Sequence, residues 1–399
     1  MQSNISTIFI IIIHIALLSD AISQPSQNIT GRVFDAESQR PLSNANVMIL
    51  EAGPITGVTT NPEGYFTFED VPVGRYNLLI SYTGYESTIM KEVLCEAGKE
   101  GHLDIGMKEA VIELGEVSIA NVSKDQTVNI MAGVSARSFT VEETEKYAGS
   151  WGDPARMAAN FAGVFTNSDI YNFIVIRGNS PNGLIWRMEG IPIPNPNHWD
   201  YPGLTGGPIS MINNNLLAQS DFLSGAFPSE YANGISGVFD LQMRNGNSKK
   251  HEYMAQLGLL SLEFGAEGPF SKKSNASYLI NYRRSMLGLV DELLWVNGLP
   301  NYQDLSFKLN FPLKRGNLSV FGLGGASRIA GSQADTASYP GNVTHELVER
   351  TGSKTGVIGL KYVHFISDRT RIISNLALSL TRPYERVDSL IDGEITKLV

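Results

Sequence analysis

The sequence predicts a mainly β fold in three parts: an N-terminal immunoglobulin-like β-sandwich, an α+β middle region, and the first strands of a transmembrane antiparallel β-barrel. Short apolar runs separated by turn residues predict the sandwich in residues 28–108. Helix-cap signals and strands bounded by glycine define residues 124–247. Residues 248–399 alternate apolar with polar or small side chains, which is the pattern of barrel strands.

Composition excludes several classes of protein. A length of 399 residues is too great for one ordinary domain, since domains run to roughly 100–200 residues. With 42% hydrophobic and 18% charged residues, the chain is not intrinsically disordered. Thirty-one Lys and Arg against 40 Asp and Glu give a charge of −9, which argues against nucleic acid as a partner. Cys95 is the single cysteine, so the fold has no intramolecular disulfide.

Residues 1–23 are expected to be a cleaved signal peptide. The apolar run from Ile8 to Leu18 has the length of a signal core and is shorter than a membrane span. Ala21 and Ser23 supply the small residues before a cut ahead of Gln24. An uncleaved anchor is the alternative, and either interpretation predicts export.

Within residues 28–108, the segments PLSNANV, TNPEGYFTF and PVGRYNLLISYTGY follow one another with turns between them. This succession resembles the carboxypeptidase regulatory-like domain. Because such domains accompany zinc carboxypeptidases, a metal site has to be considered. None of the six histidines begins an H-x-x-E pair, and the two His-Glu pairs lack a second histidine in the H-E-x-x-H register. No metal is therefore expected.

Residues 109–123 form a short linker. Its centre, Leu114, Gly115, Glu116, Val117, Ser118 and Ile119, has the alternation of a strand. One interpretation is an exposed strand that another chain completes through main-chain hydrogen bonds. The other is a final strand of the sandwich.

The middle region combines helices with strands. Helices are expected over 141–146 and 153–161, the second with Asp153 as its cap and Pro154 at its first position. Strands are expected over 172–178, 183–190 and 237–243.

Three blocks of the middle region, DPARMAANFAGV, FIVIRGNSPNGLIWRMEGIPIPNPNHW and SDFLSGAFPSEYANGISGVFDLQMRNG, resemble the plug domain of TonB-dependent outer-membrane receptors. Glu189 and Ala162 depart from the usual Asp and Pro. With the signal and sandwich, the layout is similar to that of Bacteroidetes receptors. The resemblance implies TonB as a partner at residues 114–119, an outer-membrane location with the N-terminal domain in the periplasm, and a scarce ligand such as a siderophore, cofactor, glycan or peptide.

The resemblance also directs attention to individual plug residues. Arg177, Gly178, Glu189 and Gly190 are expected to be structural, with Arg177 and Glu189 interacting inside the plug. Ligand binding is the alternative for Arg177 and Glu189. A second group, in the segment from Asn195 to Tyr201, has two interpretations: a substrate contact at the plug apex, or a rigid loop packed on the barrel wall. Its candidate side chains are Asn197, His198, Trp199 and Tyr201.

Six barrel strands are expected, at 252–264, 275–283, 304–311, 317–324, 355–363 and 370–380, with the start of a seventh at 394–399. Plugged transporters close with about 22 strands. The sequence is therefore expected to be a fragment or truncated reading frame of a longer receptor. The alternative is an exported surface or adhesion protein whose residues 250–399 form a second soluble β domain.

Catalytic motifs are absent from the sequence. Gly234-Ile235-Ser236-Gly237 continues with Val238 and so misses the G-x-S-x-G pattern, and Ser353 stands where a P-loop requires glycine. We therefore expect no enzyme activity, no catalytic residues and no cofactor.

Overall fold

The computed structural model describes residues 26–36, 38–50, 56–96, 100–110, 129, 135–147, 149–166, 168–200, 203, 205–258, 260–271, 274–287, 300–335, 345–367, 370–391 and 394–397. The chain divides into two compact units. One holds residues up to Val33 together with Pro41–Leu103, and the other holds Phe34–Arg40 with everything from Asp104 onward. The expected signal peptide and the Leu114–Ile119 segment lie outside the described residues.

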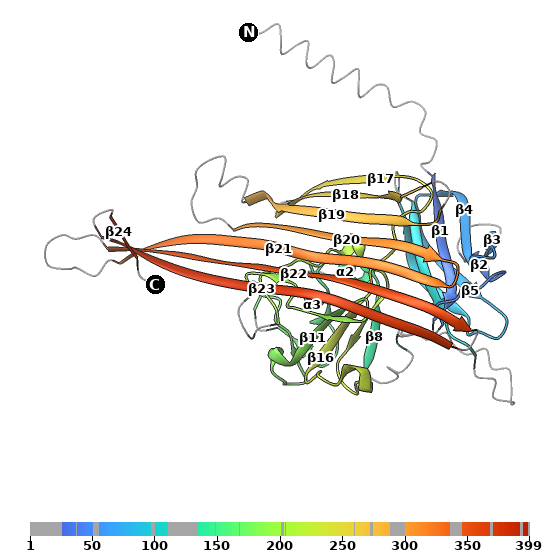
Figure 1. Ribbon diagram of the computed structural model, residues 1–399, viewed down its shortest axis with the longest axis horizontal. Coiled ribbons are helices and arrows are strands. Elements are labelled where there is room, and N and C mark those ends of the chain that lie inside the picture. Colours follow the sequence, from blue (N-terminus) through green and yellow to red (C-terminus); the bar gives the residue numbers. More distant parts are fainter. Residues whose placement is uncertain are drawn as a thin grey trace, which may run out of the picture. The chain divides into compact units, whose positions relative to one another are not determined.

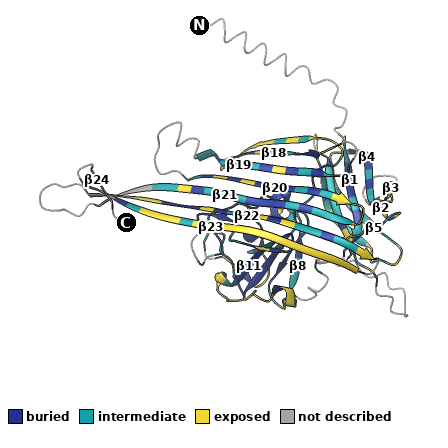
Figure 2. Cartoon of the chain, in the orientation of Figure 1, coloured by how far each residue is buried: buried dark blue, intermediate teal, exposed yellow. Residues whose placement is uncertain are grey.

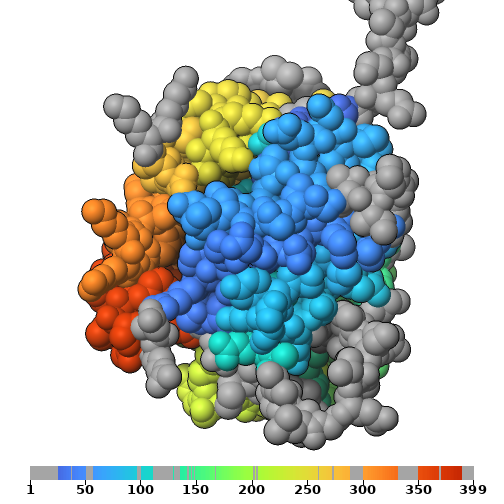
Figure 3. Space-filling model, turned by 90° about the vertical axis from the view of Figure 1, so that its right-hand side faces the viewer, coloured from blue at the N-terminus to red at the C-terminus, as the bar shows by residue number. Residues whose placement is uncertain are grey.

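The N-terminal region is an immunoglobulin-like arrangement of two sheets, with strand orders β4-β1-β7 and β3-β2-β5-β6. Strand alternation sends Phe66 and Phe68 from the first sheet, and Leu78 and Ile80 from the second, into a core where each is at most 3% exposed. Figure 3 shows this region, in blue, as a continuous surface on the face it presents. The strands are β1 (Ser26–Asp35), β2 (Asn46–Ile49), β3 (Thr56–Thr59), β4 (Tyr65–Pro72), β5 (Gly74–Ser81), β6 (Thr88–Cys95) and β7 (Gly101–Met107).

One glycine of the sandwich is fixed by a close contact. A Cβ atom on Gly31 would lie 2.6 Å from the ring of Phe66, which pairs with it across β1 and β4. The ring therefore covers the backbone of Gly31, and a larger residue there would displace a core aromatic.

The middle region, called the plug region below (described residues 135–247), is built on a five-stranded sheet of order β12-β11-β16-β15-β8. β11 and β16 run parallel, whereas the other neighbours are antiparallel. Trp186 and Phe239 stack at 4.4 Å between ring centroids in its core. The larger strands and helices are β8 (Ala136–Phe139), α2 (Val141–Lys146), α3 (Pro154–Ala158), β11 (Leu184–Met188), β12 (Ile191–Ile193), β15 (Ser220–Leu223) and β16 (Gly237–Leu241).

Short elements complete the plug region. They connect the main sheet and shape its loops. They are β9 (Val164–Phe165), β10 (Val175–Ile176), β13 (Asn197–His198), β14 (Ile209–Ser210) and the 3-10 turns η1 (Pro181–Gly183), η2 (Asn214–Leu216) and η3 (Ser229–Tyr231).

Helix starts in this region follow the sequence prediction, but one helix end does not. Thr140 caps α2, and the Asp153 side chain accepts a hydrogen bond from the backbone N–H of Ala155 at the start of α3. The expected helix 153–161 ends at Ala158, where turns lead to Gly163 at a φ of +79°. The expected strand 172–178 is reduced to β10, because its flanking residues bond to loops.

The C-terminal region, called the wall below, is an antiparallel sheet in which eight strands follow one another in chain order from β17 to β24. Figure 1 shows the plug region against one face of this sheet. Among the described residues, β17 and β24 each pair on one side only, so the sheet is open. The strands are β17 (Glu252–Leu257), β18 (Ser261–Pro269), β19 (Ser277–Ser285), β20 (Asn301–Leu313), β21 (Gly316–Asp335), β22 (His345–Ser367), β23 (Thr370–Ile391) and β24 (Glu394–Lys397).

Two expectations about the wall need correction. The single strand expected over 252–264 is a hairpin of β17 and β18, and Gly258 donates its N–H to the carbonyl of Ser261 at the turn. Continuous apolar residues on both sides of this turn hide it in the sequence. β21, β22 and β23 are 20, 23 and 22 residues long, because pairing continues well beyond the apolar segments that signalled them. The mainly β fold with an immunoglobulin-like N-terminal part is confirmed.

Candidate functional site

The candidate functional site is the interface between the plug region and the wall. Buried residues alternate with more exposed ones along β19 and β20, whereas β23 is exposed over much of its length, as Figure 2 shows. The strand register shows which face of the wall each residue lies on. The face toward the plug region carries Asp304, Ser306, Lys308 and Asn310 of β20, all at most 6% exposed. Their neighbours in sequence point the other way. Charged and amide side chains of β20 therefore line part of the surface that the plug region covers, and Phe321, Leu323 and Val357 of the neighbouring strands add apolar side chains that share its core.

Glu189 is the centre of the first contact. It lies between β11 and β12 with Gly190, and both have positive φ, 56° and 81°, as a tight hairpin turn requires. Its Oε1 atom accepts hydrogen bonds from Nζ of Lys308 and from the N–H of Met243, each at 2.8 Å. Nζ of Lys361 lies 3.7 Å from Oε2. One carboxylate thus connects the turn, the end of β16 and two wall strands.

The electrostatic balance at Glu189 follows from these contacts. The side chain is only 5% exposed, and burial alone would raise the pKa of its carboxyl group. Lys308 and Lys361 outweigh this effect, so the pKa lies below its ordinary value. Glu189 is therefore ionised and paired in the folded protein.

Arg177 does not interact with Glu189, contrary to expectation. Its Nη2 atom donates to Oγ of Ser135 at 2.8 Å, and its N–H donates to the carbonyl of Gly163. Arg177 lies directly after β10 and points toward Ser135 before the start of β8, whereas the Glu189 turn faces the wall. Gly178 follows at a φ of +78°, in the left-handed region that favours glycine. Both residues serve the plug backbone.

The second contact involves His198 on β13. Its Nε2 atom lies 2.9 Å from Oδ2 of Asp304, and Nε of Arg283 donates to Oδ1 of the same carboxylate at 2.9 Å. His198 has no exposed side-chain surface. Burial lowers its pKa despite the carboxylate beside it, so the ring is neutral and its Nε2–H donates to Asp304.

The residues after His198 continue along the wall. The N–H of Trp199 donates to Oγ of Ser327 at 3.0 Å, and the hydroxyl of Thr355 donates to the Asp200 carboxylate. Asn197 is fully buried and Trp199 is 7% exposed. Asn197, His198 and Trp199 are therefore buried against the wall, as the packed-loop interpretation expects, and substrate contact stays a prediction. Tyr201 lies outside the described residues.

An internal network holds this loop in shape. Asn172 donates from Nδ2 to Asp153 at 2.6 Å and to Asn197 at 2.8 Å, while its Oδ1 accepts from the N–H of Gly207. Burial raises the pKa of Asp153. The helix cap and the wall-facing loop therefore share one buried hydrogen-bond network.

Further contacts near the start of the wall were not foreseen. Glu263 accepts hydrogen bonds from Nδ2 of Asn213 at 2.9 Å and from Nδ2 of Asn281 at 2.8 Å. Arg244 forms a two-pronged ion pair with Glu267, at 2.7 and 2.6 Å. The sequence shows that every second residue of these strands is polar, which indicates a polar face. It does not show which residue of the plug region each polar side chain contacts. Among the described residues, no group of three His, Cys, Asp or Glu side chains has the arrangement of a metal site.

Comparisons with known proteins bear on separate parts of the chain. Residues 28–108 match the carboxypeptidase regulatory-like domain family. No curated protein sequence matches the chain. Within the described part of the chain, no helix is both long and apolar enough to cross a membrane.

Three solved structures illustrate the similarity found. The ferric enterobactin receptor PfeA of Pseudomonas aeruginosa is 13% identical over 64% of this chain and 46% of its own, with a TM-score of 0.36. The siderophore receptor PirA of the same bacterium is 11% identical over 65% and 61%, with a TM-score of 0.32. A chain of a cohesin–X-dockerin complex of Acetivibrio cellulolyticus is 19% identical over 21% of this chain and 58% of its own, with a TM-score of 0.18. The chain spans about half the length of PfeA.

Proposed function

We propose that this chain supplies the sandwich, plug and wall strands of a TonB-dependent outer-membrane receptor that takes up a scarce ligand. The observation that carries the proposal is the two-faced wall. Its inward face meets the plug region through buried charges beside apolar side chains, and its opposite face carries continuous exposed apolar rows. A soluble sheet that buries a polar face and exposes an apolar one has the wrong side toward water. A sheet between plug and lipid requires this arrangement.

The outward face can be followed row by row through the strand register. Cross-strand partners form two successive rows without a charged side chain. They are Phe264, Tyr282, Leu305, Gly324, Gly356 and Leu380, and then Ala266, Ile280, Phe307, Gly322, Ile358 and Leu378. Leu376, Leu378 and Leu380 are 71%, 74% and 67% exposed. These exposed leucines support contact with lipid.

The height of the apolar surface suits a bilayer. On β23 the outward positions from Ile372 to Leu380 are apolar except Ser374. At roughly 3.3 Å per residue this stretch measures about 26 Å along the strand. At the tilt of about 35–45° that barrel strands have, it rises about 20 Å, most of the apolar band about 25 Å tall that outer-membrane barrels carry.

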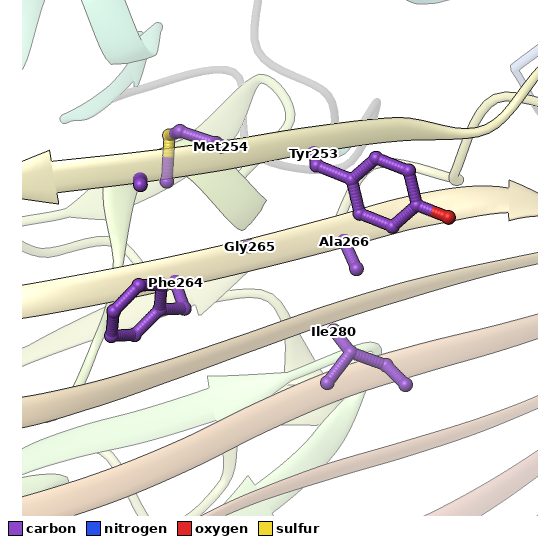
Figure 4. Close-up of a pocket in the computed structure, with 7 residues that line it drawn as sticks. Tyr253, Met254, Phe264, Gly265, Ala266 and Ile280 are labelled. Atoms are coloured by element: carbon purple, nitrogen blue, oxygen red, sulfur yellow. The ribbon is translucent and has the colours of Figure 1, made fainter.

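A shallow pocket lies on the same outward face. Figure 4 shows Tyr253 from β17, Phe264 and Ala266 from β18, and Ile280 from β19 around it. The remaining lining residues are Met254, Ala255 and Gly265. Small side chains create the depression, and the Tyr253 hydroxyl is its only side-chain polar group. Such a surface fits an acyl chain better than a polar ligand.

The test of lipid contact is Leu378→Arg in the full chain. An arginine near the middle of a bilayer costs about 2–4 kcal/mol, so outer-membrane recovery should fall. On a water-exposed surface the same change costs within about 0.5 kcal/mol. The matched control is Ser379→Arg, on the opposite face of the same strand. Unchanged recovery for Leu378→Arg, or a soluble periplasmic product for the unaltered chain, would favour the adhesion alternative.

TonB binding is proposed for Leu114–Ile119, by addition of a strand to the partner. Val117→Pro removes one amide donor and should abolish capture by the periplasmic domain of TonB. Val122→Pro, outside the segment, is the control. Normal capture of the Val117 variant would show that the assigned segment is wrong.

A further inference from the structure

A pair of cations lies directly beyond the apolar rows on the outward face of the wall. Lys354 of β22 and Arg382 of β23 are cross-strand partners, next along their strands from the pair Gly356 and Leu380. Both are exposed. They therefore stand where the apolar surface ends and the headgroup layer of a bilayer would begin.

Two like charges directly opposite on neighbouring strands repel each other. Within the described part of the chain, no carboxylate pairs with Lys354 or Arg382. A sheet that retains this arrangement places a site of concentrated positive charge, with at least four N–H donors, at one position on its surface.

The next cation pair along the same strands shows how the chain resolves such repulsion elsewhere. Arg350 and Arg386 are also cross-strand partners on the outward face. Asp388 lies between them: it forms an ion pair with Arg350 and accepts from Nε of Arg386 at 2.8 Å. This pair has its own anion. The pair nearer the apolar rows has none among the described residues.

We propose that Lys354 and Arg382 bind the phosphate group of a membrane-lipid headgroup. The inference rests on the proposed membrane location of the wall. A phosphate between the two side chains takes the place that Asp388 has in the neighbouring pair, and the lipid's acyl chains then lie along Leu380, Leu378 and Ile358. Charge and apolar surface thus match the two ends of one amphipathic molecule.

Two neighbouring residues strengthen the site. Arg328 of β21 is outward-facing one row further along, where it pairs with Gly352. Gly352 in turn pairs with Tyr384, which is 40% exposed. Tyrosine is enriched at the membrane–water boundary because its ring is apolar and its hydroxyl is polar. Both residues thus suit the level of a headgroup.

The experiment titrates phosphatidic acid into the purified full chain in a neutral detergent and counts bound lipid by native mass spectrometry. A cation near a lipid surface contributes about fivefold in affinity. The double variant K354Q/R382Q should therefore bind about 25-fold more weakly. The control K314Q/R315Q removes the same charge from the exposed turn between β20 and β21 and should bind within about twofold of the unaltered chain.

Three outcomes overturn the inference. They are equal losses in both double variants, no loss in K354Q/R382Q, and inorganic phosphate competing as well as the lipid does, which would indicate a site for free anions. The conservative variant K354R/R382K should retain binding and so excludes a folding defect. Membrane insertion is tested separately by Leu378→Arg, so insertion without a phosphate preference refutes only this inference.

Discussion

The sandwich core and the plug–wall interface are both buried, but they differ in how much charge they contain. Ile29, Phe66, Phe68 and Ile80 fill the sandwich with side chains that have no polar groups. The plug–wall interface adds ionised and amide side chains, such as Glu189 with Lys308, to an apolar cluster that includes Phe321 and Leu323 of the wall. Apolar packing is favourable in any orientation that excludes water, whereas buried ion pairs contribute little net stability and demand one geometry. Apolar packing thus stabilises the fold of the sandwich, whereas the ion pairs of the interface fix the position of the plug region on the wall.

The largest effect is expected in the sandwich. Phe68→Ala removes a ring that is 2% exposed and leaves a cavity, at a cost of about 3–5 kcal/mol. Hydrogen exchange on the full chain should show faster exchange of β4 and β5 amides. Glu69→Ala, at an exposed position on the same strand, is the control. Equal loss of protection in β11 would contradict the separation of the two regions.

A smaller effect is expected from Lys308→Met. This change leaves Glu189 buried without its nearest cation, and breaking a buried pair costs about 3 kcal/mol even when Lys361 remains nearby. Amides of β11 and β12 should exchange faster, while those of the sandwich should not change.

The double variant E189Q/K308M separates charge from shape in this contact. A buried neutral amide costs less than a buried unpaired carboxylate, so the double variant should recover part of the lost protection. Equal losses in the single and double variants would show that the ion pair is not what holds the turn to the wall.

The smallest effect is a pH dependence at His198. The pKa of His198 is lowered in the folded protein. The unfolded protein, in which the pKa is near 6.5, therefore binds more protons on acidification. The contribution of neutral His198 is therefore present above about pH 6.5 and is lost as pH falls below it, by at most about 1.4 kcal/mol per pH unit. Asp304, Arg283 and Asp200 face the ring. Trp199 fluorescence against pH measures the change.

His198→Gln is the matched variant for the pH experiment. Glutamine retains a donor for Asp304 but does not titrate. The dependence between about pH 6.5 and 5 should therefore vanish in this variant. A slope unchanged from that of the parent protein would assign it to another group.

Local features were predictable from the sequence, whereas pairings were not. The alternation of Leu305, Phe307 and Leu309 with Asp304 and Lys308 fixed both faces of β20, since side-chain direction in a strand depends only on position. Caps at Thr140 and Asp153 are equally local, although only Asp153 was named in advance.

Tertiary partners depend on register between distant segments. Lys308 and Glu189 are 119 residues apart, and nothing in either segment indicates the other. For the same reason Arg177 was paired with the wrong residue. The hairpin at Gly258 was missed because apolar residues continue through the turn.

The shared carboxylate of Glu189 has a consequence for motion. Because it joins a hairpin turn, the end of β16 and the wall, the turn cannot leave the wall without exposing an anion and an ammonium group together. Neither group is stable in a dry gap. Water must therefore enter before this turn can separate from the wall, and solutes that lower water activity should slow the separation.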